Sequence, residues 1–168
     1  KPDYVNACNN MGVVLKEQGK LEEAIEIYTK ALALKPDYVD AYKNMGIALK
    51  EQGKLAEAIE AFNKALLLKP DHPDTNYNMG VVLKEQGKLE EAIEAYATAL
   101  SLKPAYIEAF NNMGVALQEQ GKREEAIEAY TKALALKPDY VDAHNNLGVV
   151  LQDQGKLDEA IEAFNKAL

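Results

Sequence analysis

Residues 39–72 read VDAYKNMGIALKEQGKLAEAIEAFNKALLLKPDH, and this stretch predicts the fold because its pattern returns along the whole chain. Proline recurs every 34 residues, and each repeat also carries two glycines seven residues apart, such as Gly46 and Gly53. Only Pro73 lies outside the proline series. A fixed period of this length is the signature of a repeat architecture. We therefore expect a single array over residues 1–168, with repeats at 5–38, 39–72, 73–106 and 107–140, a partial repeat at 141–168, and residues 1–4 as the tail of a preceding repeat.

Within one repeat the apolar residues follow the period of an α-helix. A first series stands at positions i, i+3 and i+7, namely Tyr42, Met45 and Leu49, and a second runs through residues 55–66. Gly53 separates the two series and suits the left-handed turn that follows a helix. Pro70 cannot continue the second helix. Each repeat is therefore expected to be an antiparallel pair of helices.

Acidic residues near the expected helix starts support these boundaries. Asp37 and Asp40 form an Asp-x-x-Asp pattern, which predicts Asp37 as the N-cap and Asp40 in the first turn. Glu22 and Glu23 stand at the expected start of a second helix, where a carboxylate is favoured by the helix dipole.

The composition narrows the range of functions. Lys and Arg total 19 against 27 Asp and Glu, a net charge of −8, which argues against a nucleic acid partner because phosphate binding needs a basic face. No apolar run approaches the roughly 18 residues that cross a membrane. One cysteine and two histidines leave no disulfide framework and no histidine-rich metal centre. We expect neither a metal nor a cofactor.

The repeat resembles the tetratricopeptide repeat, or TPR. In the stretch quoted above the resemblance rests on Gly46 facing Ala58, on Leu49, and on three further positions: Phe62, Ala65 and Pro70. The same pattern covers the whole chain. It implies an all-α fold, a right-handed superhelical solenoid of antiparallel helix pairs with a period of 34 residues.

Within this family the chain is similar to the repeat arm of O-linked N-acetylglucosamine transferases and to related bacterial repeat proteins. The similarity rests on segments such as VDAYKNMG and VDAHNNLGVVLQDQGK. The chain starts without methionine and stops at Leu168, before the Lys-Pro that closes earlier repeats, so we expect a segment of a longer array. A cytoplasmic location is expected.

One position departs from the family, which often has a large aromatic residue early in the first helix. Here the position is variable, with Cys8, Tyr42, Asn76, Phe110 and His144. A buried, unpaired amide at Asn76 would cost about 1–3 kcal/mol, which predicts a weak interface between the second and third repeats.

Few residues could carry catalysis. Cys8 and His144 stand at a packing position, His72 with Pro73 is expected in a turn, and Arg123 replaces a leucine found in the other repeats. Glu22 and Glu23 are adjacent and point in different directions, unlike a hydrolytic pair. We expect no catalytic residue.

Binding is better supported, because the resemblance implies that the first helices line a concave groove. Matching positions give one polar stripe per repeat, in which acidic residues outnumber lysines. The expected peptide-binding residues in this stripe are Asp40, Lys43, Asp74, Tyr77, Glu108, Asn111 and Asp142.

An asparagine column completes the expected site, with Asn10, Asn44, Asn78, Asn112 and Asn146. Asparagine is a poor helix former, so its recurrence calls for a reason. The amides could bind the main chain of an extended peptide, could form hydrogen bonds between neighbouring repeats, or could be left over from recent duplication. These readings stay open at the level of sequence.

The expected function is a non-enzymatic protein-interaction scaffold that binds an extended protein segment, favouring one with basic residues. A substrate-recruiting arm of a larger transferase and a self-associating structural spacer are the alternatives. Head-to-tail association would bury apolar residues expected to be exposed at the two ends, Leu157, Ile161, Phe164 and Leu168 in the last helix and Val5, Cys8 and Leu15 in the first.

Overall fold

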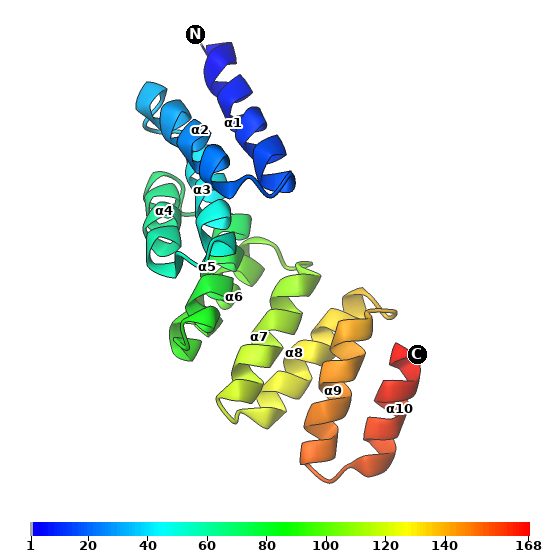
Figure 1. The fold of residues 1–168 in the computed structure, drawn as a ribbon. Helices are drawn as coiled ribbons and strands as arrows, with labels where there is room; N and C mark the ends of the chain where they lie inside the picture. Colours follow the sequence, from blue (N-terminus) through cyan, green and yellow to red (C-terminus); the bar gives the residue numbers. More distant parts are fainter. Residues whose placement is uncertain (1) are drawn as a thin grey trace. The chain divides into compact units, whose positions relative to one another are not determined.

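The computed structural model describes residues 2–168, and within this range it contains ten α-helices and no strand (Figure 1). The helices are α1 (Pro2–Glu17), α2 (Leu21–Leu34), α3 (Val39–Glu51), α4 (Leu55–Leu68), α5 (Pro73–Glu85), α6 (Leu89–Leu102), α7 (Ile107–Glu119), α8 (Arg123–Leu136), α9 (Val141–Asp153) and α10 (Leu157–Ala167). Among them, no helix is long and apolar enough to cross a membrane. The predicted all-α fold is confirmed.

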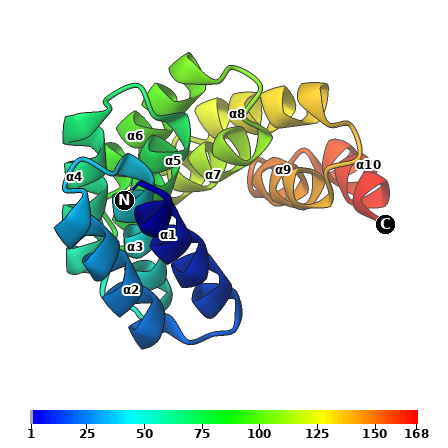
Figure 2. The same ribbon diagram turned by 90° about the horizontal axis from the view of Figure 1, so that it is seen from above.

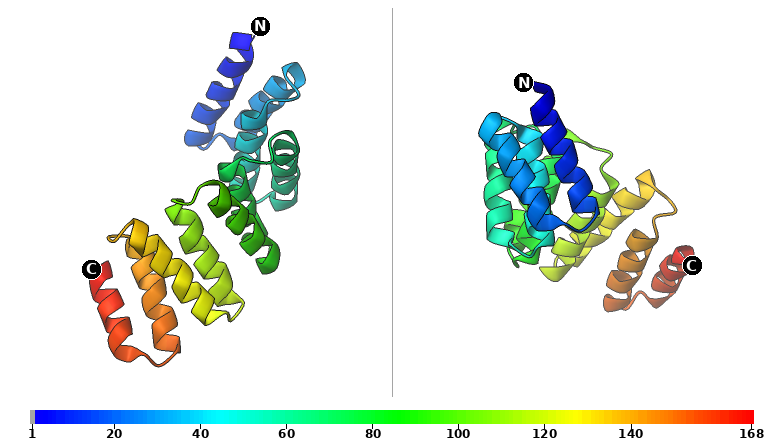
Figure 3. Two further views of the ribbon diagram at one scale, coloured as in Figure 1. Left: turned by 180° about the vertical axis from the view of Figure 1, so that it is seen from behind. Right: turned by 45° about the horizontal axis from the view of Figure 1, so that its top comes forward.

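The chain divides into two compact units, Lys1–Gln86 and Gly87–Leu168. In the first unit α1 packs on α2 and α3 packs on α4 (Figure 2). The first helix of each repeat also contacts that of the next, α1 with α3 and α3 with α5. In the second unit α7 packs on α8 and α9 on α10, while α7 also contacts α9 (Figure 3). Within each unit the first helices of successive repeats are therefore neighbours.

Glycine forms the turn inside each pair, as the sequence predicts. Gly53 has a φ of 76°, in the left-handed region that other residues avoid, and no atom lies within 4 Å of where its Cβ would be. The turn is closed by hydrogen bonds from Gly53 N to Lys50 O at 2.8 Å and from Lys54 N to Leu49 O at 2.9 Å. Backbone conformation, not space, explains this glycine.

The start of α3 corrects one prediction. Its N-cap is Tyr38, and no side chain caps the helix there, so Asp37 is not the N-cap. Asp37 lies in a turn closed by the hydrogen bond from Tyr38 N to Lys35 O at 3.2 Å, which places it one residue too early. Asp40 does lie in the first turn of α3.

The first glycine of each repeat, such as Gly46, is required for a different reason, which the sequence pattern did not predict. A Cβ on Gly46 would stand 2.6 Å from Cε1 of Phe62, so the atoms nearest to this position belong to the aromatic ring of α4. Gly12 with Tyr28, Gly114 with Tyr130 and Gly148 with Phe164 repeat the arrangement. In these four pairs an aromatic ring therefore packs directly against the backbone of a glycine.

The variable position early in the first helices is a packing position whatever residue occupies it. Cys8, Asn76 and His144 are buried. The Asn76 amide donates to Pro70 O at 3.3 Å and to His72 O at 3.0 Å, so the expectation of an unpaired amide is wrong. His144 Nε2 makes the corresponding contact to Pro138 O at 2.8 Å. Polar residues here bind the loop before their own helix.

The expected exposure of the two ends is half right. Leu157, Ile161 and Leu168 are exposed at the C-terminal end, and Phe164 is half-buried. Val5, Cys8 and Leu15 are buried instead of exposed, because they face α2 and α3. The apolar residues that α1 exposes are Tyr4, Met11 and Val14.

Candidate functional site

The expected binding residues all lie on the first helices, α3 and α5 in one unit and α7 and α9 in the other, with Asn10 on α1. The exposed members are Asn10, Asp40, Glu108 and Asp142. The half-buried members are Lys43, Asn44, Asp74, Tyr77, Asn78, Asn112 and Asn146. Asn111 alone is buried, which makes it a poor direct contact for a ligand. We call these residues the first-helix strip.

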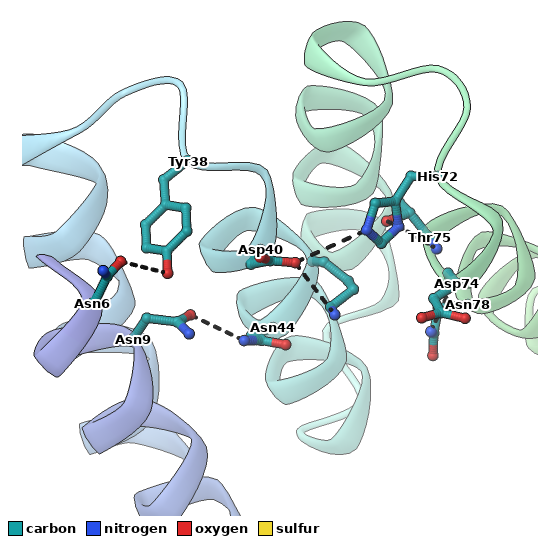
Figure 4. Close-up of polar contacts among 10 residues, drawn as sticks. Asn6, Asn9, Tyr38, Asp40, Asn44, His72, Asp74, Thr75 and Asn78 are labelled. Carbon is teal, nitrogen blue, oxygen red and sulfur yellow. Dashed lines mark hydrogen bonds and ion pairs between the residues drawn. The ribbon is translucent and has the colours of Figure 1, made fainter.

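The asparagine column joins neighbouring first helices at two places. Asn44 Nδ2 on α3 donates to Asn9 Oδ1 on α1 at 3.0 Å (Figure 4). Asn146 Nδ2 on α9 donates to Asn111 Oδ1 on α7, also at 3.0 Å. The acceptors Asn9 and Asn111 are only 7% and 6% exposed. At these two places the reading as a hydrogen bond between repeats is confirmed.

Asn78 makes no such bond. The residue that corresponds to Asn9 in the previous repeat is Lys43, and Asn78 Nδ2 donates instead to Asp74 O of its own helix at 2.7 Å. The two asparagines therefore have the same place in the repeat but different partners. The partner of each asparagine depends on the residue 35 positions before it, in the preceding repeat: where that residue is asparagine, the two amides bond.

A polar cluster links α3 to the start of α5 (Figure 4). Asp40 Oδ1 lies 3.6 Å from Lys43 Nζ and 3.9 Å from His72 Nε2. His72 is the N-cap of α5, where its Nδ1 accepts a hydrogen bond from Thr75 N at 3.3 Å and lies 2.9 Å from Thr75 Oγ1. Because Nδ1 accepts, the ring proton of neutral His72 sits on Nε2, facing Asp40.

The surroundings of His72 favour its neutral form. Burial lowers its pKa first, and the nearby charge of Lys43 lowers it further, outweighing the carboxylate of Asp40. The expectation of His72 in a turn thus missed its capping role. Pro73, the proline outside the 34-residue series, also belongs to this helix start. It is the first residue of α5, where no backbone donor is needed.

Charges on the first helices are partly paired within the first unit. Lys16 Nζ on α1 lies 3.7 Å from Glu51 Oε1 on α3, and Lys43 contacts Asp40. In the second unit the pKa of Tyr140, at the start of α9, is raised mainly by burial. The carboxylates of Asp142 and Glu108 raise it further, so both act on this phenol. The acidic side of the strip is therefore a property of both units.

Sequence reasoning missed three residues of this region: Asn9, His72 as a cap, and Thr75. A signal for Asn9 existed, since asparagine returns at Asn111 and Asn145 in the same column. Across residues 4–168, no group of three or more His, Cys, Asp or Glu is arranged to hold a metal ion.

Comparisons with known proteins agree with this architecture. The family model described as TPR repeat matches residues 14–53, 48–87, 82–121 and 119–155. No curated protein sequence matches the chain.

Solved structures of similar fold include a crystal structure of MamA, 28% identical over 93% of this chain and 91% of that one, with a TM-score of 0.87. A MamA segment from Desulfovibrio magneticus RS-1 is 27% identical over 98% and 93% of the two chains, with a TM-score of 0.90. YrrB, described as a TPR protein with an unusual peptide-binding site, is 28% identical over 95% and 82%, with a TM-score of 0.79.

The helix pairs, the glycine turns and the family match lead to one conclusion: the chain belongs to the tetratricopeptide repeat family.

Proposed function

We propose that the protein is a non-enzymatic interaction scaffold in which each unit binds an extended, basic protein segment along its own part of the first-helix strip. The observation that carries the proposal is an excess of hydrogen-bond acceptors on the strip. Among residues 4–168, the side-chain oxygens of Asn44, Asn78 and Asn146 accept no hydrogen bond, while one N–H of each amide is already used. Main-chain N–H groups and lysine or arginine side chains are the matching donors.

The carboxylates add to this preference. Asp40 is exposed, Asp74 is half-buried beside Asn78, and Glu108 and Asp142 are exposed in the second unit. These charges would raise the affinity for a basic segment, and added salt would lower that affinity. The peptide-binding site described for the TPR protein YrrB supports peptide binding as a use of such repeats. A recruiting arm of a larger enzyme would be one setting for the same binding.

The test compares two fluorescent peptides, one of alternating alanine and lysine and one of alternating alanine and glutamate, by fluorescence anisotropy at low salt. We expect the lysine peptide to bind at least about tenfold more tightly, with affinity falling as salt rises. The double variant Asp40→Asn and Asp74→Asn should weaken it several-fold. The matched control is Asp37→Asn with Asp71→Asn, which removes two exposed loop carboxylates. Equal loss in both double variants would reject the strip as the site.

Self-association is the second candidate, favoured by one observation. Met45 and Ala48 on α3 pack against α2, whereas Met11 and Val14, at the corresponding positions of α1, are exposed. A helix face like that of α10, with exposed Leu157 and Ile161, could cover them in a second copy. Sedimentation velocity over a range of concentrations tests this, and Val14→Glu should abolish the association. A monomer at all concentrations would exclude it.

A further inference from the structure

Two hollows in the second unit lie away from the first-helix strip. The first has a volume of about 270 Å³ between α6, α7 and α8, with Leu100, Phe110, Met113 and Leu117 among its apolar walls. The second has a volume of about 300 Å³ between α8, α9 and α10, with Leu134, His144, Leu147 and Leu151. Volumes of this size suit one large side chain better than a whole cofactor.

The hollows are the same site repeated. Their walls correspond residue by residue at an interval of 34, so that Leu100 matches Leu134 and Leu117 matches Leu151. The wall residue that changes chemical class is the variable one early in the first helix, Phe110 in the first hollow and His144 in the second. The departure from the family pattern therefore lies in the wall of a cavity.

The edges of the hollows are acidic. Lys132 Nζ lies 2.7 Å from Glu128 Oε1, and Lys166 Nζ lies 2.7 Å from Glu162 Oε1, so these charges compensate each other. One turn earlier, Glu125 and Glu159 also line the hollows and are exposed. Within residues 4–168 neither of these two carboxylates has an ion-pair partner. Each hollow thus combines apolar walls with one uncompensated negative charge.

We propose that these hollows form a second docking surface, which takes a peptide segment of another protein with an aromatic side chain next to a lysine or arginine. The aromatic side chain fills the hollow against Phe110 and Met113, and the cation meets Glu125. Charge complementarity selects this occupant over an acidic segment. Phe110 makes the first hollow the stronger of the two, because a histidine wall is more polar.

The surface is distinct from the proposed strip. Glu108 and Asn112 belong to the strip, whereas Phe110, Met113 and Leu117 of the same helix line the hollow. A ligand on the strip and a ligand in the hollow would therefore perturb different residues of α7. This difference allows the two proposals to fail separately.

The experiment uses the peptide Gly-Ser-Gly-Phe-Lys-Gly-Ser-Gly and its partner with glutamate in place of lysine, titrated into the labelled protein while amide chemical shifts are recorded. We expect shifts at Phe110, Met113 and Ala129, with the lysine peptide binding about fivefold or more tightly. Shifts confined to Glu108 and Asn112 would overturn the proposal and place the peptide on the strip. Absence of shifts, or equal binding of both peptides, would also overturn it.

Two variants sharpen the assignment. Ala97 is exposed on α6 and lines the first hollow, so Ala97→Leu fills the hollow with a good helix former and should weaken binding about fivefold or more. The matched control, Ala56→Leu, makes the same change at an exposed position of α4 and should leave binding unchanged. In the second hollow, His144→Phe should strengthen binding, with new shifts at Leu147 and Ala163. Unchanged binding in Ala97→Leu, with circular dichroism showing a folded protein, would reject the hollow.

Discussion

The joint between α1 and α3 and the joint between α3 and α5 belong to the same unit and to the same repeat pattern, yet they are held differently. In the first, Asn44 on α3 donates to the buried Asn9 on α1. In the second, Lys43 stands where Asn9 would be, and Asn78 turns back to its own helix. A residue that recurs in every repeat therefore does not do the same thing in every repeat, because its role is set by the residue it faces.

In place of the bond between asparagines, the second joint has a set of hydrogen bonds at the start of α5 that the first joint lacks. Three residues at the start of α5 depart together from the pattern of the other repeats, namely His72, Thr75 and Asn76. Thr75 N donates to His72 Nδ1, which also lies close to the Thr75 hydroxyl, and the Asn76 amide donates to His72 O. The hydrogen bonds of this segment fix the helix start and the preceding loop, not the neighbouring first helix. One joint therefore has a hydrogen bond between first helices, whereas the other has hydrogen bonds at the helix start and the 3.9 Å contact of His72 with Asp40 on α3.

The largest effect is expected from Asn76→Ala. Asn76 is buried and donates to the carbonyl oxygens of Pro70 and His72, which the change would leave without this donor. We expect the free energy of unfolding to fall by about 2 kcal/mol, since two hydrogen bonds are lost and each contributes about 1 kcal/mol. Urea denaturation followed by circular dichroism measures this. A change near zero would show that water replaces the amide and that the helix start is not the tie.

The next effect separates the two asparagines. Asn44→Ala removes the donor of the buried Asn9 oxygen and should cost about 1 kcal/mol. Asn78→Ala removes only a bond within its own helix, and the gain in helix propensity, several tenths of a kcal/mol, should offset most of the loss. Urea denaturation of both variants under the same conditions is the measurement. Equal losses would mean that the bond between α1 and α3 adds nothing to stability.

The helix pairs and the Gly53 turns could be predicted from the sequence because both depend on local spacing and backbone conformation. The contact of Gly46 with Phe62 could not, since it depends on where the ring points when two helices cross. The capping role of His72 also escaped, because histidine is not among the usual N-cap residues. For the candidate site, the column of asparagines was visible, but the partner of each one required the register between helices.

A smaller effect should follow when the first kind of joint is built into the second. Lys43→Asn places an asparagine at the position of Asn9, so that Asn78 gains the acceptor that Asn44 already has. We expect stabilisation of about 0.5 kcal/mol, because a new hydrogen bond adds about 1 kcal/mol while the contact of Lys43 with Asp40 and some helix propensity are lost.

The control for this gain is the same change at Lys50, which is also half-buried on α3 but has no asparagine to meet. Lys50→Asn should only destabilise, through its lower helix propensity. A double-mutant cycle of Lys43→Asn with Asn78→Ala should show a favourable coupling. If the two changes are additive, no bond has formed, and the difference between the joints has another origin.

The smallest effect concerns pH and only the second joint. Burial and Lys43 lower the pKa of His72 in the folded protein below the value of about 6.5 for the free side chain. The unfolded chain therefore binds this proton more readily, and stability is full above about pH 6.5, falling as the pH decreases toward the lowered folded pKa. Protonation would also take the lone pair with which Nδ1 accepts from Thr75 N. His72→Asn keeps a capping side chain that cannot titrate, so the dependence of the melting temperature on pH around and just below 6.5 should flatten in this variant. The control is His144→Asn, at a position with no contact to Asp40 or Lys43. This variant should keep the dependence of the melting temperature on pH. If His72→Asn and the unchanged protein lose stability in parallel, the titration of His72 does not reach the joint, and only its uncharged hydrogen bonds hold the start of α5.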